Sequence, residues 1–140
     1  MAWQEDLRTR LLGLPPLAAI TANVSWYDLP RGLWSAAVLL TEVSPGEGWT
    51  HDGPMTLLNP RVQFDCYAEA AADVRTLERI IKDELQRLDD VTIGDSVFSP
   101  PAQLQIRLRT REELTGSDSQ PARTLYRVMQ DFSFFTRPAY

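Results

Sequence analysis

The segment from Asn59 to Leu88 constrains the fold most, because the spacing of its apolar residues changes partway along. Between Arg61 and Tyr67 every second side chain is apolar, which predicts a strand with one covered face. That face would carry Val62, Phe64 and Cys66, and the other Arg61, Gln63 and Asp65. From about Ala70 the apolar residues recur at helical spacing: Val74, Leu77, Ile81, Leu85 and Leu88, with Ile80 widening the stripe. A strand and a helix with matching apolar faces predict a two-layer core.

The rest of the chain adds one helix and further strands to this core. The helix is predicted over Trp3–Leu14, where Gly13 and Pro15-Pro16 would end it. Strands are predicted at Ile20–Trp26, Leu33–Val43, Ala102–Leu114 and Ala122–Phe135, and a short irregular one at Val91–Ser99, broken by Pro100-Pro101. The expected fold class is α+β. A single domain over residues 1–140 would hold a mainly antiparallel sheet of four to five strands, with two helices packed on one face.

Two of these strands carry finer expectations. The centre of the second strand, Ala36–Leu40, is apolar on both faces and should be covered on both sides. The last two strands are consecutive and joined by a polar loop, so they should pair antiparallel. On the final strand, Val128, Gln130, Phe132 and Phe134 share a face with Tyr126, whereas Arg127, Asp131 and Ser133 lie opposite.

Two segments rich in breakers are predicted to be long loops. Ser44–Met55 contains two prolines and three glycines, and Glu112–Pro121 is polar around a glycine. Loops of this length in a small domain are usually functional or mobile. The residues in them that could contact a partner are Glu47, Trp49, His51, Asp52, Thr115 and Asp118.

Composition and charge narrow the class of protein. The chain has 140 residues, 44% of them hydrophobic, and no segment approaches the length of a membrane span. The N-terminus lacks the pattern of a secretory signal, so the expected site of assembly is the cytoplasm. Residues 1–100 carry 8 basic and 15 acidic side chains, whereas residues 101–140 carry 6 and 4. This asymmetry would suit head-to-tail contacts between copies, although chance explains it more simply.

The side chains offer little for catalysis or for cofactor binding. His51 could act as a general base beside Asp52, but a lone loop histidine more often has no special role. One cysteine and one histidine make a zinc site implausible, and Cys66 is most simply a small buried apolar residue. Asp65 would face away from the core, where a carboxylate is usually solvated. We therefore expect no enzyme activity, no metal and no cofactor.

The sharpest charged feature is a row of arginines at every second position of a predicted strand: Arg107, Arg109 and Arg111. With Leu104, Ile106 and Leu108 inward, the three guanidinium groups would project outward together. A solvated face, or protection of a sheet edge, is the plainest interpretation. Contact with an acidic neighbouring subunit ranks above binding of nucleic acid, because the whole chain is acidic. Phosphate or carboxylate binding is a further alternative.

Three segments follow one another in a set order: Trp26–Gly32 before the apolar strand, Asn59–Ala68 with the Ala-rich helix start Glu69–Ala72, and the ending Arg127–Pro138. This order resembles the tail-terminator (tail-completion) proteins of long-tailed phages and gene transfer agents. The resemblance covers about Leu7 to Pro138, and its most specific parts are RVQFDCYA and DFSFFTRP. None of these segments is a catalytic motif. The loop over Ser44–Met55 is longer and more acidic than the family pattern, so the resemblance does not indicate which partner this loop contacts.

The resemblance implies a structural protein of the virion or of a phage-like particle, located at the head–tail junction. Such proteins form a hexameric ring at the head-proximal end of the tail tube. The implied partners are therefore further copies of the chain, the tail tube protein, and a head–tail connector or stopper. DNA would pass through the ring without specific binding, and no membrane is involved.

Other interpretations remain open on the residues alone. The chain could instead be a different connector, a stopper or a tail tube subunit of the same particle. More remotely, it could be a small-molecule-binding or enzymatic α+β domain, which would need a pocket with convergent polar groups.

Overall fold

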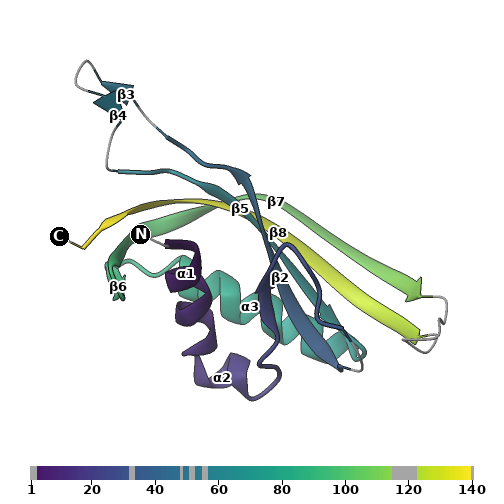
Figure 1. Cartoon of the computed structure of the whole chain (residues 1–140). Helices are drawn as coiled ribbons and strands as arrows, with labels where there is room; N and C mark the ends of the chain where they lie inside the picture. The colour runs from purple at the N-terminus through teal and green to yellow at the C-terminus, as the bar shows by residue number, and fades with distance from the viewer. Residues whose placement is uncertain are drawn as a thin grey trace.

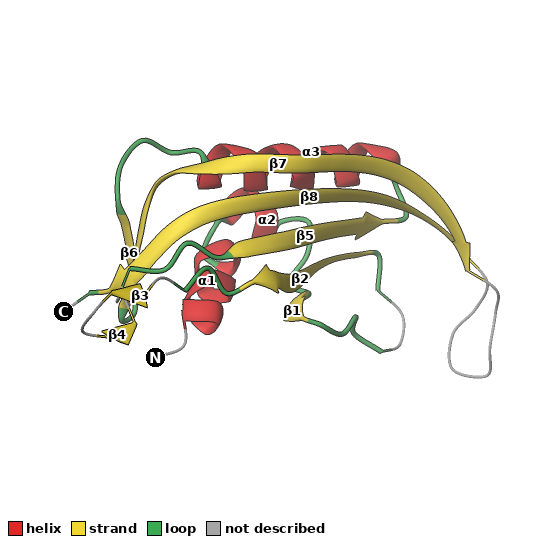
Figure 2. Cartoon of the chain, turned by 90° about the horizontal axis from the view of Figure 1, so that it is seen from above, coloured by secondary structure: helices red, strands yellow, loops and turns green. Residues whose placement is uncertain are grey.

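The computed structural model describes residues 3–31, 34–47, 49–50, 53–54, 57–114 and 123–139, with the backbone alone at 49–50, 53–54, 101 and 112–114. The main sheet has six strands. It is curved and lies across the molecule, and the helices pack on one of its faces (Figures 1 and 2). The helices are α1 (Trp3–Leu12), α2 (Pro15–Ala18) and α3 (Ala71–Leu85). The sheet strands are β1 (Val24–Trp26), β2 (Ala36–Ser44), β5 (Arg61–Ala68), β6 (Val91–Ile93), β7 (Ser96–Leu114) and β8 (Arg123–Pro138). The predicted α+β class is confirmed, with more strands than the four to five expected.

The strands run in the order β1-β2-β5-β8-β7-β6. β1 pairs parallel with β2, and every other neighbouring pair in this sheet is antiparallel. The two longest strands, β7 and β8, pair antiparallel as predicted and form a ribbon that extends past the helices (Figure 1). No helix in the described part of the chain is long and apolar enough to cross a membrane.

The core forms where β5 and α3 meet, as the change of spacing predicts. The core residues Val62, Phe64 and Cys66 are fully buried, and the rings of Phe64 and Phe132 meet edge to face at 5.8 Å. The helix contributes Val74, Leu77, Ile81 and Leu85. Leu88 is 86% exposed because α3 ends at Leu85, so its inclusion in the apolar stripe is wrong.

The N-terminal helix is shorter than predicted and is followed by a second one. α1 ends at Leu12, and α2 begins at Pro15-Pro16. The first turn of a helix tolerates proline, because the backbone N–H groups of that turn have no partner within the helix and proline lacks only that N–H. Arg10 of α1 is only 6% exposed, and its Nε donates to Glu84 Oε1 at 3.1 Å. Burial lowers the pKa of Arg10, and the bond to Glu84 opposes that effect.

The second strand is covered on both faces, as predicted. Ala36, Val38 and Leu40 lie in the main core, whereas Ala37 and Leu39 pack in a smaller cluster on the opposite face. β1 is shorter than the predicted strand over Ile20–Trp26 and pairs only with Val38–Leu40.

Pro100 and Pro101 do not break the strand that contains them. β7 runs through both, and its register against β8 shifts between Ser99 and Gln103. β6 pairs only with Ser96–Phe98, so the prolines lie where β7 has one neighbouring strand instead of two. A strand edge and a bulge are the places where a sheet tolerates proline.

The predicted loop over Ser44–Met55 contains a separate two-stranded sheet. β3 (Trp49–Thr50) pairs antiparallel with β4 (Gly53–Pro54) and lies away from the helices, beyond the ends of β2 and β5 (Figure 1). We call residues 45–59 the arm. At its base Gly46 has φ +64° and lies so close to Asn59 that a Cβ would collide with the Asn59 carbonyl. Only glycine combines that backbone angle with such an approach.

Candidate functional site

The sheet face opposite the helices, which we call the outer face, carries two ion pairs between β5 and β8. Arg61 Nε donates to Asp131 Oδ2 at 2.7 Å, and Arg127 Nη2 donates to Asp65 Oδ1 at 2.8 Å. The register places Asp131 opposite Gln63 and Arg127 opposite Tyr67. Each arginine is therefore a diagonal neighbour of its aspartate, within the reach of a long side chain.

Both aspartates are buried on this outer face. Asp65 is 2% exposed and Asp131 is 3% exposed, because the arginines and the neighbouring side chains cover them. Gln63 Nε2 also donates to Asp65 Oδ2, at 2.8 Å. The expectation that Asp65 is solvated is therefore wrong: on a sheet face with no covering layer, side chains of neighbouring strands can still bury a carboxylate.

Sequence reasoning did not find these pairs, although a signal for them was present. β5 contains Arg61-Val62-Gln63-Phe64-Asp65, and β8 contains Arg127-Val128-Met129-Gln130-Asp131. Two copies of the pattern Arg-Val-x-x-Asp in antiparallel strands bring each arginine to the aspartate of the other. Recognising the signal required knowing that β5 and β8 are neighbours.

A small apolar cluster covers the end of the outer face nearest the start of β8. It consists of Trp34, Ala37, Tyr67 and Leu125. The guanidinium of Arg123 stacks 4.2 Å from the centre of the Trp34 ring, and its Nη1 donates to the Trp34 carbonyl at 2.7 Å. These contacts attach the chain just before β2 to the start of β8.

The arginine row on β7 does not project as predicted. A second register shift, between Leu104 and Ile106, reverses which face each later side chain occupies. Arg107 and Arg109 consequently lie on the helix side of β7, where their guanidinium groups contact Glu78 Oε1 at 2.9 and 2.7 Å. Glu78 of α3 is only 6% exposed.

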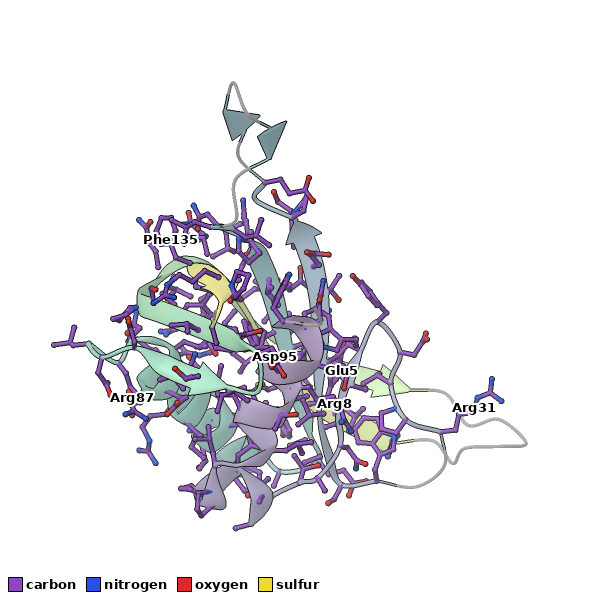
Figure 3. The ribbon with its side chains drawn as sticks, turned by 60° about the vertical axis from the view of Figure 1, so that its left-hand side comes forward. Glu5, Arg8, Arg31, Arg87, Asp95 and Phe135 are labelled. Carbon is purple, nitrogen blue, oxygen red and sulfur yellow. The ribbon has the colours of Figure 1, made fainter. Side chains whose placement is uncertain are left out.

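The same shift brings apolar side chains to the outer face. Ile106 and Leu108, predicted to point inward, are 47% and 51% exposed on the part of β7 beyond β6, whose free edge has no neighbouring strand among the described residues. Phe135 of β8 is also exposed and lies near the base of the arm (Figure 3). Leu104, before the shift, packs against the main core as predicted.

The structure brings only some of the predicted contact residues together. Arg107, Arg109 and Arg111 lie along one strand, while Glu47 is exposed in the arm, beyond the far end of the sheet. Trp49 is placed by its backbone, in β3. His51, Asp52, Thr115 and Asp118 lie outside the described residues.

The described side chains do not assemble a recognisable catalytic group. Burial raises the pKa of the Cys66 thiol far above its ordinary value, which keeps it protonated and unreactive. Within the described ranges, no three histidine, cysteine or acidic residues are grouped to hold a metal ion. A recess of about 270 Å³ between α2 and α3 is lined by Leu14, Pro16, Ile80, Asp83 and Glu84. What the molecule displays is therefore a set of surfaces: the outer face, the free edge of β7 and the arm.

Comparison with solved structures identifies a chain that shares this fold. No protein-family model matches the chain, and no curated protein sequence matches it. A chain of the virion of a native gene transfer agent particle superposes with a TM-score of 0.62, covering 96% of this chain and 93% of that one. The two sequences are 14% identical, so the likeness shows a shared fold.

Proposed function

We propose that the protein is a structural component of a phage-like particle that closes the head-proximal end of the tail. In this role copies of the chain form a ring, most simply of six, that stops growth of the tail tube and presents a surface to the head connector or stopper. The observation that carries the proposal is the fold shared, over nearly the full length of both chains, with a chain from a gene transfer agent virion.

The distribution of surfaces supports this role. A ring needs two different faces of one subunit that complement each other. The sheet has two distinct edges on opposite sides, and the arm and the ribbon extend from opposite ends of the molecule (Figure 1). Extended segments of this kind can reach a neighbouring subunit above or below the ring. The proposed partners are thus other copies of the chain, the tail tube protein and the connector.

Electron microscopy of tail tubes tests the proposal. The tail tube protein of the same particle would be assembled with and without this protein at equal concentrations. We expect tubes of limited length with a ring at one end when the protein is present, and longer open tubes when it is absent. Tubes built by this protein alone would identify it as a tube subunit and contradict the proposal. Unchanged tube length with no bound ring would contradict it as well.

A further inference from the structure

The two edges of the main sheet are left open in the same way. β1 covers only Val38–Leu40 of β2, so Thr41–Ser44 has no neighbouring strand on that side within the described residues. β6 covers only Ser96–Phe98 of β7, so the described chain provides no neighbour for the β7 edge from Ser99 to Leu114. Figure 2 shows β1 and β7 on opposite sides of the sheet. An open edge presents unpaired N–H and C=O groups that can bind another strand.

The two open edges carry opposite charge. The open β7 edge is basic over residues 103–111, which contain three arginines and no acidic residue, and its last residues include Glu112 and Glu113. Residues 32–60, which include the open edge of β2 and the arm, contain Glu42, Glu47 and Asp52 and no lysine or arginine. Both edges also expose apolar side chains, with Val43 50% exposed on β2 and Leu108 51% exposed on β7.

A recess beside the β7 edge could accept an acidic side chain. Its volume is about 120 Å³, and its lining includes Arg75 of α3 and Arg109 of β7, with Ala71 and Tyr126 nearby. Two guanidinium groups at one recess suit a carboxylate. Arg109 already binds Glu78, which fixes its position.

Other edge contacts are less favourable. Pairing two β7 edges would bring two arginine rows together, and pairing two β2 edges would bring glutamates together. Both contacts are unfavourable, because like charges on facing strands are destabilising. The edge at β1 is partly occupied, because Arg8 Nε donates to the Val24 carbonyl at 2.6 Å.

We infer that copies of this chain join head to tail, with the acidic edge of β2 (Thr41–Ser44, continuing to Glu47) on the basic edge of β7 in the next copy. The contact is heterologous, so it can close into a ring. This inference rests on the proposed ring and specifies which surfaces form it. The partner it names is a second copy of the chain.

Charge reversal with complementation tests this inference. The variant E42R/E47R reverses the β2 edge, and R75E/R111E reverses the β7 edge without altering Arg107, Arg109 or Glu78. Native mass spectrometry would compare each variant with the wild type, alone and on tube ends. We expect each variant alone to give the 15.9 kDa monomer and their equimolar mixture to restore the wild-type assembly. In the mixture, basic edges meet acidic edges again in an alternating ring.

Controls and the remaining outcomes separate this inference from the proposed function. E5R/D90R changes charge by the same amount as E42R/E47R, away from both edges, and should assemble normally. I106D should also give monomers, with an unchanged circular dichroism spectrum. L88D, the control at an exposed residue, should assemble as the wild type does. Assembly and tube capping by the reversed variants would overturn the edge contact and leave the proposed function standing. Failure of the mixture to reassemble would overturn it too, and a wild type that stays monomeric even on tube ends would overturn both.

Discussion

At the scale of single residues, Gln130 is the least satisfied group in the described core. Its side chain is fully buried between Val128 and Phe132 on the helix side of β8, and neither amide atom has a hydrogen-bond partner. Burying an amide without partners costs free energy that an apolar side chain of similar size does not. The residue therefore weakens the fold at the centre of its longest strand pair.

Replacing this glutamine should stabilise the protein. For Gln130→Met we expect the free energy of unfolding to rise by about 1 kcal/mol or more, measured by urea denaturation. Gln63→Met is the matched control: Gln63 donates to Asp65 at 2.8 Å, so its replacement should lower stability. Equal destabilisation by both changes would show that Gln130 has partners in solution.

Cys66 gives a pH-dependent prediction. Burial raises the pKa of its thiol in the folded state, so the thiolate forms only on unfolding. Below the ordinary thiol pKa of about 9 both states are protonated and the group does not oppose folding. Above it, ionisation of the unfolded chain should lower the free energy of unfolding by up to about 1.4 kcal/mol per pH unit. Denaturation between pH 8 and 10.5 should therefore show a steeper fall for the wild type than for Cys66→Ala. Parallel curves would mean that the thiol is not buried.

At the scale of elements, the Glu78 carboxylate joins α3 to β7. Its Oε1 contacts both Arg107 and Arg109, at 2.9 and 2.7 Å. Apolar side chains of α3 pack on β5 and β8 in the main core. On β7, the contacts of α3 include the ion pairs of Glu78. Glu78 thus adds a buried ionic contact between α3 and β7 to the pairing of β8 with β5.

Removing that carboxylate should loosen the ribbon more than the core. For Glu78→Ala we expect a loss on the order of 1–3 kcal/mol in the free energy of unfolding, because hydrogen bonds to a buried charged group are lost. Amide hydrogen exchange should rise in residues 103–111 and change less in β5. Asp83→Ala, at an exposed position of the same helix, should leave both measurements unchanged. Uniform exchange throughout the chain would show that Glu78 has no local role.

At the scale of the whole molecule, the opposite charges of the two open edges make assembly sensitive to salt. Attraction between exposed charges is largely screened beyond about 10 Å at 0.1 M salt and about 3 Å at 1 M. We expect the assembled fraction, measured by sedimentation velocity, to fall as salt rises from 0.05 to 0.5 M. The E42R/E47R variant should lose this dependence. Assembly that strengthens with salt would indicate that the contact is dominated by apolar surface.

Much of the layered fold could be predicted from spacing alone. Alternation predicted β5 and β8 with the correct residues in the core, and helical spacing predicted α3, because each pattern reflects burial of one face of one element. The two prolines were misleading: an isolated proline pair suggests a break, and only the position of β7 beside a short edge strand makes it tolerable.

What the sequence by itself determined is local: which residues form strands or helices, and which face of each is apolar. What only the tertiary structure decided depends on register between strands distant in the chain. One bulge after Leu104 turned Arg107 and Arg109 toward Glu78 and exposed Ile106 and Leu108, and the pairing of β5 with β8 buried Asp65 against Arg127. A shift of one residue reverses every later side chain, and its energy lies in contacts between strands, so no pattern within one segment could reveal it.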